Sequence, residues 1–149
     1  MATDPLFQRD AFLREFEATV TAVTPVSGDQ TGAQSRAASV VLDRTAFYAG
    51  GGGQPCDIGM FAFPSGLATV TKVSSKEGEI VHELEGDIPT VGAQVTGSVD
   101  WDNRYALMRT HTALHILCGV IWREYGAHVT GGNMTPLAGR MDFEFENIT

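Results

Sequence analysis

Hydrophobic and polar positions alternate along much of the first hundred residues. Residues 16–23 alternate in this way and are rich in threonine and valine, which indicates a strand with one buried face. Five further strand-like segments follow, separated by glycine- and proline-containing breakers: 38–43, 58–63, 67–73, 79–84 and 94–99. Residues 27–34 are polar and are expected to form a loop. Many short strands joined by frequent turns predict a small β-barrel or a β-sandwich.

The hydrophobic pattern changes from a strand period to a helix period after residue 100. No glycine or proline interrupts the chain from residue 101 to 118, and apolar side chains recur at helical spacing. We expect a helix over residues 103–125, with Asp102 as its N-cap and Gly126 as its end.

The segment beyond this helix predicts a turn and then a strand. Residues 130–133 contain two glycines and are expected to form the turn, whereas residues 139–146 alternate between apolar and acidic side chains like a strand. The sequence therefore predicts an α+β protein with a β-rich domain over residues 1–100 and a partial α/β domain over residues 101–149.

The second domain is too small to bury its own apolar faces. One helix and one strand leave much of their apolar surface open to water. We therefore expect this domain to lean on the first one, to pair with a second copy in a homodimer, or to be completed by a C-terminal segment outside this sequence.

Charge and composition limit the classes of partner. The net charge of −8 argues against non-specific binding of nucleic acid. Residues 101–140 are mildly basic, with four arginines against Asp102 and Glu124, which fits either a small phosphate-binding patch or scattered solvated arginines. The sequence has no apolar run long enough to span a membrane, no secretory signal and only two cysteines. We expect a cytoplasmic protein with no membrane partner.

Two histidines on the predicted helix are candidate metal ligands. His111 and His115 are four residues apart, so a helix presents both imidazoles on one face. Such a pair can hold one divalent metal, usually zinc, although it supplies only half of a tetrahedral site. The alternative is two polar residues at the edge of a core. His82 lies in a predicted strand without a metal-spaced partner and is expected to be structural.

A run of four glycines, residues 50–53, stands before Gln54 and Pro55. Glycine permits positive φ and the close approach of a ligand or of another backbone segment. The alternative is a flexible hairpin connection. The run lacks the Gly-Lys-Ser/Thr of a phosphate loop and the spacing of a dinucleotide-binding loop.

Four segments taken in order carry a family resemblance: Asp-Ala-Phe-Leu-Arg-Glu-Phe-Glu at 10–17, the stretch from Asp43 to Gln54, Arg-Thr-His-Thr-Ala-Leu-His at 109–115, and a Gly-Gly pair leading into Arg-Met-Asp-Phe-Glu-Phe at 140–145. Together they resemble the AlaX-type trans-editing proteins, which are relatives of the editing domain of alanyl-tRNA synthetase. The resemblance implies a translation-factor-like barrel followed by an α/β editing domain.

The resemblance also implies a reaction and a site. The reaction is hydrolysis, in trans, of tRNA(Ala) mischarged with serine or, as a second substrate, glycine. His111 and His115 match the family's first two Zn²⁺ ligands, and Thr45 and Gln54 match polar residues near its editing pocket. The backbone amides of the glycine run, including those of Gly52 and Gly53, are further candidates for binding the substrate. No catalytic residue is assigned.

One departure from the family pattern leads to a second hypothesis. In the family, a later Cys-x-x-x-His motif supplies two more zinc ligands, and no such motif follows residue 115 in this sequence. The sequence therefore predicts an aminoacyl-tRNA deacylase, with a non-catalytic module that binds tRNA or another partner as the alternative.

Overall fold

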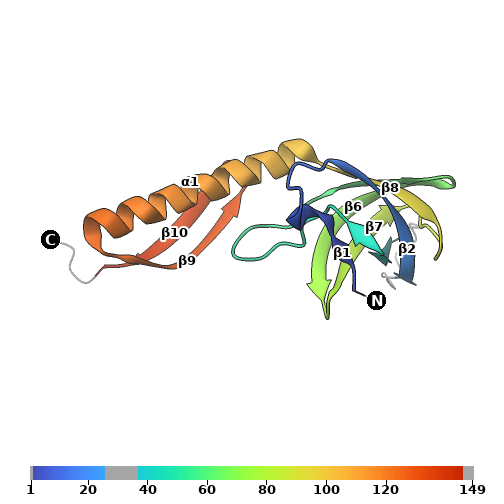
Figure 1. Ribbon diagram of the computed structural model, residues 1–149, viewed down its shortest axis with the longest axis horizontal. Helices are drawn as coiled ribbons and strands as arrows, with labels where there is room; N and C mark the ends of the chain where they lie inside the picture. The colour runs from blue at the N-terminus through green and yellow to red at the C-terminus, as the bar shows by residue number, and fades with distance from the viewer. Residues whose placement is uncertain (1, 26–36, 146–149) are drawn as a thin grey trace, which may run out of the picture. The chain divides into compact units, whose positions relative to one another are not determined.

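The structure is a computed structural model that describes residues 2–25 and 37–145. The predicted loop at 27–34 and the last position of the predicted strand at 139–146 lie outside these residues. The elements are β1 (Asp4–Pro5), η1 (Leu6–Gln8), β2 (Glu15–Pro25), β3 (Ala37–Leu42), β4 (Arg44–Thr45), β5 (Gly59–Phe63), β6 (Gly66–Lys76), β7 (Glu79–Gly86), β8 (Gln94–Val99), α1 (Trp101–Tyr125), β9 (His128–Thr135) and β10 (Ala138–Glu144) (Figure 1).

The chain divides into two compact units. The first contains Met1–Gly50 and Cys56–Trp101, and the second contains Gly51–Pro55 and Asp102–Thr149. The tip of the glycine-rich segment thus belongs to the same unit as the histidine-bearing helix, although it is far from that helix in sequence.

The first unit is a closed barrel with the strand order β2-β3-β7-β6-β5-β8. All of its strand pairs are antiparallel, and the pairing of β2 with β8 closes the barrel. Each of the six strands predicted in the first hundred residues forms one barrel strand. The prediction of a small N-terminal barrel followed by a helix is confirmed.

Alternate side chains fill the barrel interior, as the sequence pattern predicts. In β2, Phe16, Ala18 and Val20 are buried while the residues between them are more exposed. Phe47 and Phe61 are fully buried, and their rings meet edge to face with centroids 5.6 Å apart. Burying one such ring contributes roughly 1.5–3 kcal/mol. This core gives a stable base for the segment that leads out of β4.

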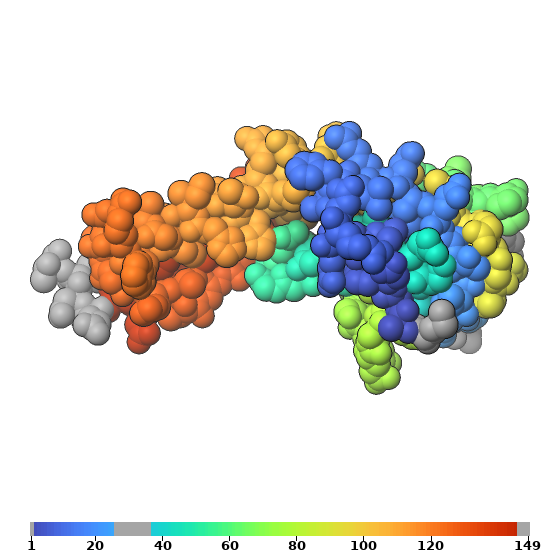
Figure 2. Space-filling model, in the orientation of Figure 1, coloured from blue at the N-terminus to red at the C-terminus, as the bar shows by residue number. Residues whose placement is uncertain are grey.

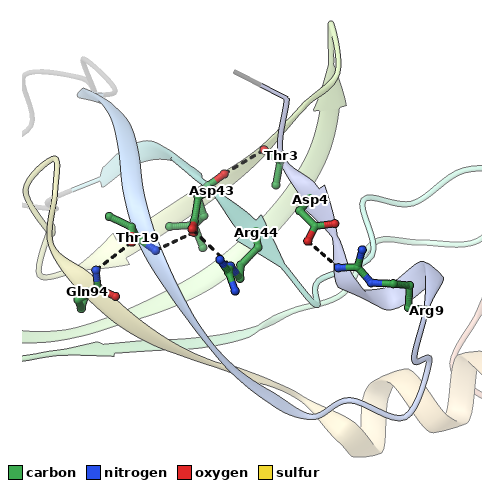
Figure 3. Close-up of polar contacts among 8 residues, drawn as sticks. Thr3, Asp4, Arg9, Thr19, Asp43, Arg44 and Gln94 are labelled. Atoms are coloured by element: carbon green, nitrogen blue, oxygen red, sulfur yellow. Dashed lines mark hydrogen bonds and ion pairs between the residues drawn. The ribbon is translucent and has the colours of Figure 1, made fainter.

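The residues around Asp43 hold the short strand β1 against the barrel, as Figure 3 shows. Asp43 Oδ1 accepts a hydrogen bond from the Thr19 N–H at 2.8 Å, and its other carboxylate oxygen lies 3.4 Å from Arg44 Nε. The Asp43 carbonyl accepts from the Asp4 N–H at 2.9 Å, and Arg9 pairs with the Asp4 carboxylate. These contacts fix the short parallel pair β1–β4.

The second unit contains α1 and the antiparallel hairpin β9–β10, which lies along the helix (Figures 1 and 2). The turn predicted at residues 130–133 is wrong, because β9 runs through it. Gly132 is paired with Met141, and an added Cβ there would lie 2.6 Å from the Met141 sulfur. This glycine permits close packing within the hairpin, and the chain reverses instead at Pro136 and Leu137, where Leu137 has a φ of 62°.

Helix α1 ends where the sequence predicts but begins two residues earlier than predicted. The helix begins at Trp101, so Asp102 lies in its first turn and is not its N-cap. An acidic side chain there still favours the helix because it faces the positive end of the helix dipole. Gly126 ends the helix with a φ of 65°, and its N–H donates to the Trp122 carbonyl at 2.8 Å.

Much apolar surface of the second unit is open to solvent. Ile116 is 64% exposed and Trp122 is 60% exposed, and both project from α1. The homodimer and the additional C-terminal segment stay predictions. Within residues 2–25 and 37–145, no helix is long and apolar enough to cross a lipid bilayer.

Candidate functional site

The paired histidines of α1 face each other across one turn of the helix. His111 is half-buried and His115 is exposed. Their Nε2 atoms are 2.9 Å apart, and the two rings stack with centroids 4.7 Å apart and an angle of 9° between planes. Two ring nitrogens thus converge on one point at the surface of the second unit.

The glycine run forms a tight turn. The N–H of Gly51 donates to the Gln54 carbonyl and the N–H of Gln54 donates to the Gly51 carbonyl, each at 3.0 Å. The two central residues, Gly52 and Gly53, have φ values of 60° and 84°, as in a type I′ turn. A Cβ on Gly53 would lie 2.9 Å from the Gly132 carbonyl oxygen. The turn therefore needs glycine for its conformation and also for its approach to β9.

The turn brings Gln54 to the histidine pair. Gln54 Oε1 lies 2.5 Å from His111 Nδ1, although the two residues are 57 positions apart in sequence. Throughout the described part of the chain, the backbone amides of Gly52 and Gly53 have no hydrogen-bond partner, and a Cβ on Gly52 would meet no atom within 4 Å. Two amide donors are thus left open beside the imidazoles.

These groups share an open pocket of about 470 Å³ in the second unit. Its lining comes from the turn, from one face of α1 and from the β9–β10 hairpin. The lining residues are Gly52, Gly53, His111, Leu114, His115, Cys118, Val129, Thr130, Gly131, Gly132, Asn133, Met134 and Met141. The structure therefore brings together four of the candidate residues around one cavity, with Gln54 bonded to His111.

The histidine pair fits two of the ligands of a tetrahedral zinc ion. Zinc–nitrogen bonds of 2.0–2.1 Å at a tetrahedral angle separate the two nitrogens by about 3.3 Å. Opening the observed 2.9 Å separation by a few tenths of an ångström reaches that value. Cys118 lines the same pocket as a free thiol. Among residues 2–25 and 37–145, no three His, Cys, Asp or Glu side chains cluster closely enough to hold a metal together.

Thr45 belongs to the barrel unit and is fully buried. Its hydroxyl donates to His82 Nε2 at 2.9 Å and accepts from the Phe47 N–H at 3.1 Å. The His82 Nδ1–H donates to the Val40 carbonyl at 3.2 Å, in agreement with the structural role expected for this histidine. Burial lowers the pKa of His82 from its ordinary 6.5 to about 4, so the ring is neutral and can accept this bond. The substrate-positioning role of Thr45 stays a prediction.

The sequence pattern does not predict the contribution of β9 to the pocket. Thr130, Asn133 and Met134 line the cavity, whereas the sequence predicts a turn at residues 130–133. The sequence signal for a strand is weak here, because the two glycines in the middle of β9 are also typical of a turn. The bond between Gln54 and His111 had no local signal at all, since it joins two distant segments.

Comparison with known proteins places the chain in a family. The family model described as tRNA synthetases class II (A) matches residues 6–103. The chain belongs to this family. Within it, the chain is a homologue of the AlaX-type editing proteins, as the ordered segments of the sequence predict.

The relatives of this class II synthetase-family chain are of two kinds. It is 38% identical over 149 residues to the alanyl-tRNA editing protein AlaX-M of Saccharolobus solfataricus, covering 97% of this chain and 58% of that protein. It is 39% identical to the AlaX-M of Methanosarcina barkeri, covering 97% and 57%. It is also 45% identical over 127 residues to the alanine–tRNA ligase of Pyrobaculum calidifontis, covering 85% and 13%. The chain thus spans a little over half the length of the editing proteins it matches.

Proposed function

We propose that the chain hydrolyses, in trans, the ester of tRNA(Ala) mischarged with serine, and with glycine as a second substrate, in the cytoplasm. One observation carries this proposal: the paired Nε2 atoms of His111 and His115 and the open amides of Gly52 and Gly53 share one pocket. The similarity to proteins named for alanyl-tRNA editing supports the choice of substrate.

We assign the metal role to the histidine pair. His111 and His115 would hold Zn²⁺ through Nε2, with the remaining ligands outside this pair. When bound, zinc supplies Lewis acidity or a water of lowered pKa.

We assign the substrate roles to the glycine-rich turn. The amides of Gly52 and Gly53 are placed to donate to the ester carbonyl oxygen. The Gln54 side-chain amide uses its oxygen for His111, which leaves its NH₂ group to donate to a serine hydroxyl. A site built around that hydroxyl disfavours alanine, because its polar groups would be left unpaired. Thr45 contributes through the backbone, since it fixes the Phe47 N–H on the segment leading to the turn.

The test of this proposal compares tRNA(Ala) charged with serine and tRNA(Ala) charged with alanine. We expect the chain, supplied with zinc, to release serine from seryl-tRNA(Ala) at least about 100-fold faster, in kcat/KM, than alanine from alanyl-tRNA(Ala). Initial rates of release with and without added zinc measure this ratio. Equal rates for the two esters, or no release from either, would contradict the proposal.

A second candidate function is a non-catalytic module that binds tRNA or a protein partner. It is favoured by the histidine pair being only half of a tetrahedral site in the described part of the chain. This function predicts tRNA binding that is unchanged by His111→Ala and His115→Ala, together with no ester hydrolysis. A filter-binding assay run beside the deacylation assay separates the two candidates.

A further inference from the structure

The hydrogen bond between Gln54 and His111 can run in only one direction. Gln54 Oε1 is a carbonyl oxygen and accepts hydrogen bonds without donating them. At 2.5 Å from Oε1, His111 Nδ1 must therefore carry the proton. A neutral imidazole holds one ring proton, so His111 Nε2 is left with a free lone pair that points away from Gln54.

The proton position on His111 also determines which ring nitrogen of His115 carries a proton. His115 Nε2 lies 2.9 Å from His111 Nε2, and two bare lone pairs would repel each other at that distance. Since His111 Nε2 is an acceptor, His115 Nε2 is the donor in the metal-free protein, and its proton would move to Nδ1 for His115 to bind zinc through Nε2. One glutamine side chain thus determines the proton position on two stacked rings.

The Gly51–Gln54 turn holds Gln54 in the required place. The reciprocal backbone bonds between Gly51 and Gln54 fix the start of the side chain. The absence of a Cβ on Gly53 lets the turn approach the Gly132 carbonyl in β9. The glycines therefore allow the turn to hold Gln54 in place, and Gln54 accepts the hydrogen bond from His111.

We propose that Gln54 is a positioning residue that locks His111 in the Nδ1–H form, so that Nε2 is presented as a ligand toward the pocket. The statement about the proton stands on the geometry alone. Its consequence for zinc rests on the proposed function. Hydrogen bonds to the second ring nitrogen of a metal-binding histidine typically change metal affinity by about 10- to 100-fold.

Ring-nitrogen NMR of ¹⁵N-labelled protein at about pH 8, where an ordinary imidazole is neutral, tests the proton positions directly. The metal-free wild type is expected to show His111 protonated on Nδ1 and His115 on Nε2. Gln54→Leu is expected to move the His111 proton toward Nε2, the form that free histidine prefers, whereas Gln54→Glu keeps it on Nδ1. Gln94→Leu, the same change on the barrel strand β8, is the matched control and should leave both rings unchanged.

A second variant and a second readout keep the test decisive. Gln54→Asn keeps the amide but shortens the side chain, and it should lose the lock even if Gln54→Leu fails to fold. Zinc affinity, measured by competition with a chromophoric chelator, should fall about 10- to 100-fold in Gln54→Asn and be retained in Gln54→Glu.

The outcomes separate this inference from the proposed function. A His111 ring that keeps its Nδ1 proton in both Gln54→Leu and Gln54→Asn overturns the role of Gln54. If the proton moves in these variants but the wild type binds no zinc, Gln54 still positions His111, and the zinc-dependent function fails instead.

Discussion

A single buried imidazole shows how individual residues couple the barrel to pH. His82 sits between the Val40 carbonyl and the Thr45 hydroxyl, and its Nε2 can accept the hydroxyl proton of Thr45 only while the ring is neutral. Burial holds its pKa near 4 in the folded state, against an ordinary 6.5 in the unfolded chain. Between these values the unfolded state binds the extra proton, so acid favours unfolding.

The barrel is therefore expected to lose stability as the pH falls from about 6.5 to about 4, by roughly 3 kcal/mol in total. His82→Gln should be less stable at neutral pH but should lack this part of the slope. Urea unfolding of both proteins at a series of pH values measures the difference between their free energies of unfolding. The carboxylates contribute equally to both proteins, so their contribution cancels in this difference. Parallel curves for the two proteins would show that His82 does not titrate in this way.

At the scale of elements, the Gly51–Gln54 turn joins the sequence-distant parts of the site. Gly52 and Gly53 both have positive φ, but only Gly53 has a backbone oxygen where a Cβ would go. Alanine at either position costs about 1 kcal/mol of conformational energy. Only at Gly53 does the added methyl group also push the turn away from β9.

These neighbouring glycines form a matched pair of variants. Gly53→Ala is expected to displace Gln54 and free the His111 ring from its Nδ1–H form, whereas Gly52→Ala should leave that ring unchanged. Ring-nitrogen spectra of the two variants beside the wild type make the comparison. The same spectrum for both variants would mean that the approach to Gly132 does not position Gln54.

At the same scale, periodicity predicted the elements better than it predicted the site. Alternation located the barrel strands because each buries one face, and the uninterrupted helical stretch located α1 and the four-residue spacing of its histidines. Gly131 and Gly132 misled the prediction, since glycine in a strand and glycine in a turn look alike in one sequence. The bond from Gln54 to His111 depends on the folded path of 57 residues, which no local pattern contains.

At the scale of the whole molecule, each of the two units contributes something different. The barrel is a closed and well-filled body whose segment after β4 carries the glycine-rich turn. The second unit holds the pocket, and the chain spans 58% of the Saccharolobus editing protein that it matches.

The deacylation rate of seryl-tRNA(Ala) under single-turnover conditions, with zinc supplied, is the most direct test of whether the paired histidines form an editing site. Replacing His111 by alanine should lower this rate at least about 100-fold, since the pocket would lose both a zinc ligand and the partner of Gln54. His128→Ala, the same change in β9 and outside the pocket lining, should keep the wild-type rate. Equal rates for the wild type and His111→Ala would contradict the claim that the paired histidines form the editing site.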